Sequence, residues 1–177
     1  MDHIDNSPVQ IEIRRRQNTL RVAGVGTALF SIWGAVKLLA LFIVFSDESV
    51  RAVRSMSDAA IELSDRGVFR VALAAAIIGA LISVAVRSYV GRAAVAESKG
   101  KKRSWFYLVV AAFLAFLDFT AFASGLLTFG APQQPGAFSG DVTITSLIID
   151  LTSAVIITEM IIAAVRIRSL TKKKSEG

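Results

Sequence analysis

The chain has 177 residues, of which 54% are hydrophobic, and it carries a formal net charge of +6. It has no cysteine, which excludes disulfides and thiol chemistry, and its single histidine, His3, excludes a histidine-based metal site or a Ser-His-Asp triad. The charged residues gather between long apolar runs, which is typical of a membrane protein and not of a soluble or nucleic-acid-binding one.

Four apolar runs are long enough to cross a bilayer as helices. About 20 helical residues, each rising about 1.5 Å, span a hydrocarbon core of about 30 Å. The first run is much longer than the roughly 7–15 apolar residues of a signal peptide, so we interpret it as a retained span. The expected fold is an all-α, polytopic integral membrane protein, with a four-transmembrane-helix bundle over residues 22–166. The four spans are about 20–45, 68–90, 105–129 and 142–165.

A further helix is predicted between the first two spans. Within residues 47–66, apolar side chains recur at steps of three and four, and charged side chains occupy the other face. This spacing predicts an amphipathic helix that lies along the outer surface of the membrane. Residues 130–141 are rich in proline and glycine, which predicts a turn between the last two spans.

The distribution of lysine and arginine predicts the orientation in the cell membrane. The N-terminal tail (1–21), the loop at 86–104 and the region from Arg166 through the basic C-terminal tail (167–177) are rich in these residues. Together these three segments contain 15 of them, whereas the 46–70 segment contains four and the 130–141 turn none. Because cytoplasmic segments carry the excess of lysine and arginine, we expect both termini to be cytoplasmic.

The lipid bilayer is the expected partner of such a chain, and no nucleic acid is expected. The C-terminal tail contains three consecutive cations, Lys172, Lys173 and Lys174. They are explained either by topology alone or by binding of anionic lipids at the inner face of the membrane.

Three ionisable residues in the spans form a predicted charge cluster: Lys37, Asp118 and Asp150. The helical rise places all three at overlapping depths in the outer half of the membrane. An ionised side chain near the bilayer centre costs roughly 2.5–3.5 kcal/mol, so we expect Lys37 to lie within ion-pair reach of Asp118 or Asp150. The cluster is either a structural ion pair or an ion or proton site, and Lys37 alone has the alternative of extending to the outer surface.

Glu159 is a second acid in the last span. It follows Asp150 by nine residues and therefore points to the opposite face of the helix, at about 100° per residue. Arg87 and Arg166 are its candidate partners near the inner interface. The alternative interpretations are a proton relay or a contact with another subunit.

No catalytic motif is present, and neither a cofactor nor a metal is expected. The sequence favours a non-enzymatic accessory or interaction protein, which binds another membrane protein or associates with itself. The alternative is an ion- or proton-coupled transporter or channel subunit, which would work as a homo-oligomer through Lys37, Asp118 and Asp150.

Overall fold

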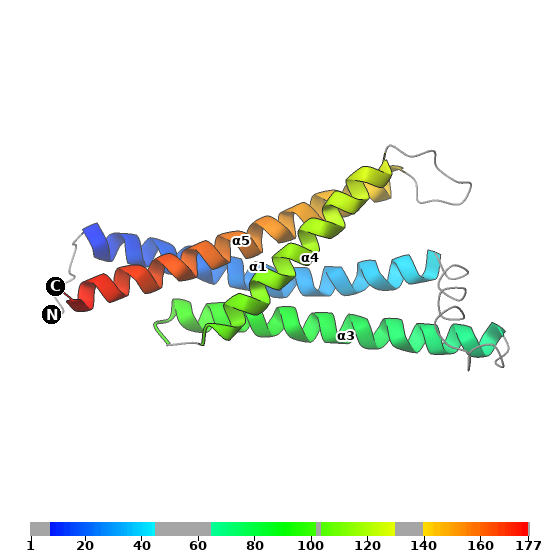
Figure 1. Cartoon of the computed structure of the whole chain (residues 1–177), viewed down its shortest axis with the longest axis horizontal. Helices are drawn as coiled ribbons and strands as arrows, with labels where there is room; N and C mark the ends of the chain where they lie inside the picture. Colours follow the sequence, from blue (N-terminus) through cyan, green and yellow to red (C-terminus); the bar gives the residue numbers. More distant parts are fainter. Residues whose placement is uncertain (1–7, 45–64, 102–103, 130–139, 177) are drawn as a thin grey trace. The chain divides into compact units, whose positions relative to one another are not determined.

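The computed structural model describes residues 8–44, 65–101, 104–129 and 140–176, and within them every element of regular structure is an α-helix. Each helix contains a stretch long and apolar enough to cross a membrane, which confirms the predicted all-α architecture with four candidate spans. The predicted amphipathic helix at 47–66 lies outside the described residues, except for its last two. The helices are α1 (Pro8–Val44), α3 (Asp65–Ser98), α4 (Phe106–Phe129) and α5 (Gly140–Glu176) (Figure 1).

Three of the helices run beyond the apolar stretches that predict them. α1 begins at Pro8, well before the apolar run that starts near residue 20. α3 continues to Ser98 and α5 to Glu176. Proline suits a first helical turn because its missing N–H would have no partner there. The arginine, glutamate and glutamine residues that follow favour helix, and no glycine or proline interrupts residues 9–23. Hydropathy therefore marks the apolar part of each helix but not its ends.

The turn between α3 and α4 is short and capped on both sides. Gly100 has a φ of 80°, and its N–H donates to the carbonyl of Glu97 at 2.9 Å. The N–H of Lys101 donates to the carbonyl of Ala96 at 3.2 Å, which completes a glycine-ended helix terminus. Ser104 caps the start of α4, because its Oγ accepts from the N–H of Phe106 at 3.1 Å. The turn brings the end of α3 next to the start of α4.

The chain divides into two compact units. Unit one comprises residues 1–29 and 87–177, and unit two comprises residues 30–86. In unit two, the rings of Phe42 on α1 and Phe69 on α3 are 5.7 Å apart and tilted by 38°. Unit one contains α4, α5, the first part of α1 and the last part of α3, so it holds most of the buried polar groups described below.

The core of unit one is built by close approach of its helices. α1 and α3 meet at Gly24 and Gly91, where a Cβ on Gly24 would lie 2.8 Å from the carbonyl oxygen of Gly91. Thr27 of α1 packs against α5, with its Oγ1 4.0 Å from Sδ of the fully buried Met160. α4 packs along α5, and the start of α1 and the end of α5 lie at the same end of this unit (Figure 1).

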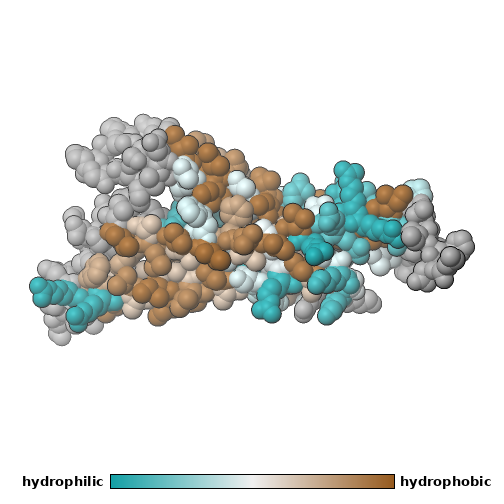
Figure 2. All heavy atoms as spheres, turned by 180° about the vertical axis from the view of Figure 1, so that it is seen from behind, coloured by the Kyte–Doolittle hydropathy of each residue, from teal (hydrophilic) through white to brown (hydrophobic). Residues whose placement is uncertain are grey.

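Large apolar side chains are exposed on all four helices. Examples are Leu29 on α1, Leu81 on α3, Val109 on α4 and Ile148 on α5, which are 64%, 64%, 65% and 59% exposed. Apolar side chains cover long stretches of the helices, and hydrophilic ones gather toward helix ends (Figure 2). Contiguous apolar surface of this extent is rare in monomeric soluble proteins and indicates a surface that contacts other apolar groups.

Candidate functional site: two arginine–carboxylate clusters

The first polar cluster joins three helices of unit one and consists of Arg87 on α3, Asp118 on α4 and Ser153 on α5; we call it the Arg87 cluster. Nη1 of Arg87 donates to Oδ2 of Asp118 at 3.0 Å and to Oγ of Ser153 at 2.9 Å, and Nη2 donates to Oδ1 of Asp118. Ser153 in turn donates to Oδ2 of Asp118 at 2.7 Å. The hydroxyl therefore both accepts from the cation and donates to the anion.

The Arg87 cluster is almost enclosed by protein. The side chains of Arg87 and Asp118 are 12% and 9% exposed, and Ser153 is buried. A buried ion pair is tolerated only when further hydrogen bonds satisfy its remaining polar atoms, and the serine does this for the carboxylate. Nε of Arg87 is buried and has no hydrogen-bond partner among the described residues.

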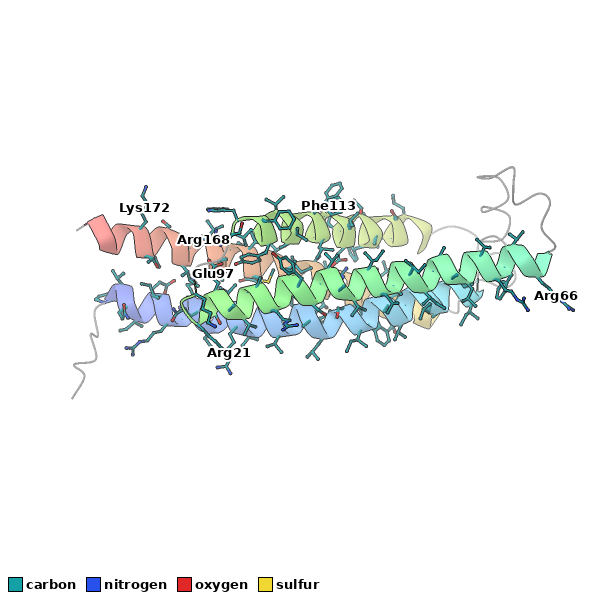
Figure 3. The ribbon with its side chains drawn as sticks, turned by 90° about the horizontal axis from the view of Figure 1, so that it is seen from below. Arg21, Arg66, Glu97, Phe113, Arg168 and Lys172 are labelled. Carbon is teal, nitrogen blue, oxygen red and sulfur yellow. The ribbon has the colours of Figure 1, made fainter. Side chains whose placement is uncertain are left out.

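The second polar cluster lies where α3 ends and α4 begins, and we call it the Glu97 cluster. Arg168 of α5 binds the buried Glu97 through two bonds, Nε to Oε1 at 2.6 Å and Nη2 to Oε2 at 2.8 Å. The hydroxyl of the buried Tyr107 on α4 donates to Oε2 of Glu97 at 2.6 Å. Glu97 and Arg168 point toward one another across the two helices (Figure 3).

Aromatic rings cover the cation of the Glu97 cluster. Cζ of Arg168 lies 4.6 Å from the ring centre of Trp105 and 5.8 Å from that of Tyr107. A guanidinium over an aromatic face gains electrostatic energy, and its planar fork matches a carboxylate. Trp105 itself is 60% exposed. The cluster thus ties α5 to the α3–α4 turn and ends in an exposed indole ring.

The two clusters have the same composition. Each contains an arginine, a carboxylate and a hydroxyl, with one group from each of α3, α4 and α5. The arginine comes from α3 in the Arg87 cluster and from α5 in the Glu97 cluster. On α3, ten residues separate Arg87 from Glu97, and on α4, eleven separate Tyr107 from Asp118. At about 1.5 Å per residue, the clusters lie roughly 15–17 Å apart along α3 and α4.

No protein-family model, curated protein or solved structure matches this chain. The chemistry of its sites therefore has to be inferred from its own residues. Among the described residues, no group of three or more histidine, cysteine, aspartate or glutamate side chains could hold a metal ion. Both clusters instead combine fixed charges with hydroxyl donors, an arrangement that holds helices in register.

Asp118, one of the three residues of the predicted charge cluster, is buried and forms an ion pair with Arg87. Asp150 is half-buried on α5, one turn before Ser153, and Lys37 is half-buried on α1 in unit two. The expected ion pair between Lys37 and an aspartate stays a prediction.

Glu159 and its two candidate partners, Arg87 and Arg166, lie in different environments. Arg87 is engaged by Asp118 and Ser153, because α3 continues as a helix past residue 90 and places Arg87 beside the middle of α4. Glu159 and Arg166 are both exposed on α5. The part of the chain that the structure describes contains no ion pair to Glu159.

The Glu97 cluster is absent from the sequence-based predictions. In the sequence, Arg168 counts only as an orientation signal, and Tyr107 only as one of the interfacial aromatic residues that open the third span. One signal was available: Glu97 is the one acidic residue in the basic segment 86–104. A lone acid among cations at the end of a helix is a candidate for an ion pair, but the sequence does not say which cation it binds.

Proposed function

We propose that this chain is an integral protein of the cell membrane that acts as a non-enzymatic interaction or accessory protein. It spans the membrane four times, with both termini in the cytoplasm. One observation carries the proposal: apolar side chains are exposed on all four helices, while Arg87 and Asp118 neutralise one another inside unit one. That is the arrangement expected where the surroundings are hydrocarbon and the charges are costly.

The depth of the clusters fits a bundle that spans the membrane. Tryptophan favours the membrane–water interface, so in the proposed orientation the exposed Trp105 and the stacked Arg168 lie at the inner boundary of the hydrocarbon core. The Arg87 cluster then lies about 15 Å deeper, near the middle of a core of about 30 Å. A lone charge is most costly there, which explains why the pair carries a third hydrogen-bonding group.

The cytoplasmic ends of the helices suit a membrane with anionic lipids. Several exposed cations near this boundary come from α1 and α5, which begin and end at the same end of unit one (Figure 1). Each cation near a negatively charged leaflet contributes about 1 kcal/mol to binding. These residues are Arg14, Arg15, Arg21, Arg166 and Lys172.

Cysteine labelling tests the proposed topology directly, because the natural chain contains no cysteine. We expect Val9→Cys and Thr171→Cys to resist a membrane-impermeant maleimide on intact cells and to react once the membrane is opened. Ser139→Cys should react on intact cells. Extraction of the protein by alkaline carbonate, or labelling of Thr171→Cys from outside, would overturn the proposal.

A transporter or channel subunit is the second candidate function. The observation that favours it is the Arg87 cluster, a charged group shared by three helices that contains one buried nitrogen, Nε of Arg87, without a described partner. Purified protein in vesicles that enclose a pH-sensitive dye distinguishes the two functions. An interaction protein gives no flux above empty vesicles, whereas a transporter gives flux that Asp118→Asn abolishes.

A further inference from the structure

Two of the charged side chains of unit one that are exposed within candidate membrane spans lie on the helices that contact α1 and have no described partner. They are Arg92 on α3 and Glu159 on α5. Three other acids are bound to arginines: Glu12 to Arg16, Glu97 to Arg168 and Asp118 to Arg87. Among the described acidic residues whose exposure is known, Glu159 alone is exposed. A carboxylate on an apolar helix surface is costly in a membrane unless it finds a partner, and no described residue of this chain supplies one for Glu159.

Contacts with α1 show that Arg92 and Glu159 lie within one to two helical turns of each other in height. Arg92 follows Gly91, which touches Gly24 of α1. Glu159 precedes Met160, which touches Thr27 of α1. Gly24 and Thr27 are three residues apart, and each charged residue lies one residue further away from the other, so the two differ in height by about 7.5 Å. The long side chains of arginine and glutamate can together span that difference.

The same contacts place the two charges on either side of α1. Each is one residue away from a position that faces α1, which is a rotation of about 100° around its own helix. Both are exposed, so each lies on the outer flank of its helix next to α1. Between them α1 exposes Val22, Val25 and Leu29, at 64%, 47% and 64%. We call these three residues, with Arg92 and Glu159, the α1 face.

We propose that a second copy of this chain covers the α1 face, with Arg92 of one copy paired with Glu159 of the partner subunit. If the two copies are related by a two-fold axis that runs parallel to the helices and through the α1 face, Arg92 of each copy faces Glu159 of the partner subunit. The Arg92–Glu159 pair therefore forms twice, and Val22, Val25 and Leu29 of both copies pack between the two α1 helices.

Charge and membrane geometry both favour a second copy as the occupant. Two copies inserted in the same orientation keep Arg92 and the partner subunit's Glu159 within about 7.5 Å of each other in depth. Lipid tails would cover the apolar centre equally well but offer no partner to either charge. The inference rests on the proposed membrane function, and it specifies which surface of the protein makes the contact.

Disulfide cross-linking locates the interface. Val25→Cys lies at the centre of the α1 face, and Phe113→Cys is the control, because Phe113 is 60% exposed on α4 and points away from its neighbours (Figure 3). In native membranes, mild oxidation should give a covalent dimer of the Val25→Cys variant. The Phe113→Cys variant should stay monomeric under the same conditions.

Charge reversal tests the residue pair in the Val25→Cys background. Arg92→Glu and Glu159→Arg should each lower the cross-linked fraction about tenfold, because like charges then face one another. The double variant restores opposite charges in exchanged positions and should recover cross-linking. Arg70→Glu changes an exposed cation on the same helix as Arg92 but in unit two, and it should leave cross-linking unchanged.

Two results would overturn the inference: cross-linking of Phe113→Cys as strong as that of Val25→Cys, or a double reversal no better than the single ones. If the charge-reversed variants fail to fold, the comparison of Val25→Cys with Phe113→Cys still tests whether the α1 face is the interface. Either failure leaves the cysteine-labelling topology intact, so a wrong interface is distinguishable from a wrong proposed function.

Discussion

Gly24 of α1 and Gly91 of α3 touch through their backbones. A Cβ on Gly24 would lie 2.8 Å from the carbonyl oxygen of Gly91, and a Cβ on Gly91 would collide with the carbonyl oxygen of Gly24. Backbone atoms cannot turn aside as the end of a side chain can. This contact therefore sets how closely α1 and α3 approach in unit one, and small residues at such crossings are typical of helices that pack in membranes.

Gly91→Ala should destabilise the protein by about 1–3 kcal/mol, because the added methyl group forces the two backbones apart. The thermal unfolding midpoint of the purified protein in detergent measures the effect. Gly79→Ala is the matched control, since a Cβ on Gly79 has no neighbour within 4 Å. That change should be neutral or slightly stabilising, because alanine favours helix. Equal losses in the two variants would contradict the importance of the crossing.

Arg87→Met should destabilise the protein by about 3–5 kcal/mol, because it leaves the buried Asp118 without its cation. Asp118→Leu should destabilise the protein by a similar amount, because it leaves the buried Arg87 without its anion. The double variant should lose less than either single change, since two apolar side chains leave no buried charge. Unfolding measured in detergent for all four proteins gives the coupling. Additive losses would show that the pair contributes no interaction energy.

Tyr107→Phe should cost about 1.5–3 kcal/mol, because the Tyr107 hydroxyl donates to a carboxylate, that of Glu97. Trypsin should also cleave after Lys101 more readily, since the Glu97 cluster holds the α3–α4 turn. Tyr89→Phe is the control, because Tyr89 is 48% exposed on the same helix as Glu97. Unchanged stability and cleavage in Tyr107→Phe would count against the role of the cluster.

Lys37→Met should be less damaging when Asp150 is neutralised in the same protein. The expected coupling is about 0.5–3 kcal/mol if Lys37 and Asp150 form an ion pair. Combining Lys37→Met with Asp150→Asn in a stability cycle measures it, and a parallel cycle with Asp118→Asn provides the comparison. If both cycles are additive, Lys37 extends to the membrane surface instead.

The number and kind of the elements follow from the sequence alone. Long apolar runs can satisfy their backbone groups in hydrocarbon only as helices, so four runs predict four helices whatever their arrangement. Hydropathy predicts the ends of the helices less well than their number. α1 and α5 extend into polar tails, because arginine, glutamate and lysine favour helix without making a segment apolar.

Tertiary structure alone decides which charges meet. Arg87 and Asp118 are 31 residues apart, and their register depends on the length of α3 and on the turn at Gly100. A depth count from the predicted span ends places Arg87 near the inner boundary, whereas the longer α3 brings it to the middle of α4. Glu97, Tyr107 and Arg168 likewise meet only after three helices have packed. The hydropathy of a segment predicts whether it lies in an apolar environment. An ion pair requires that two side chains on different helices lie within bonding distance, and only the packing of the helices sets that distance.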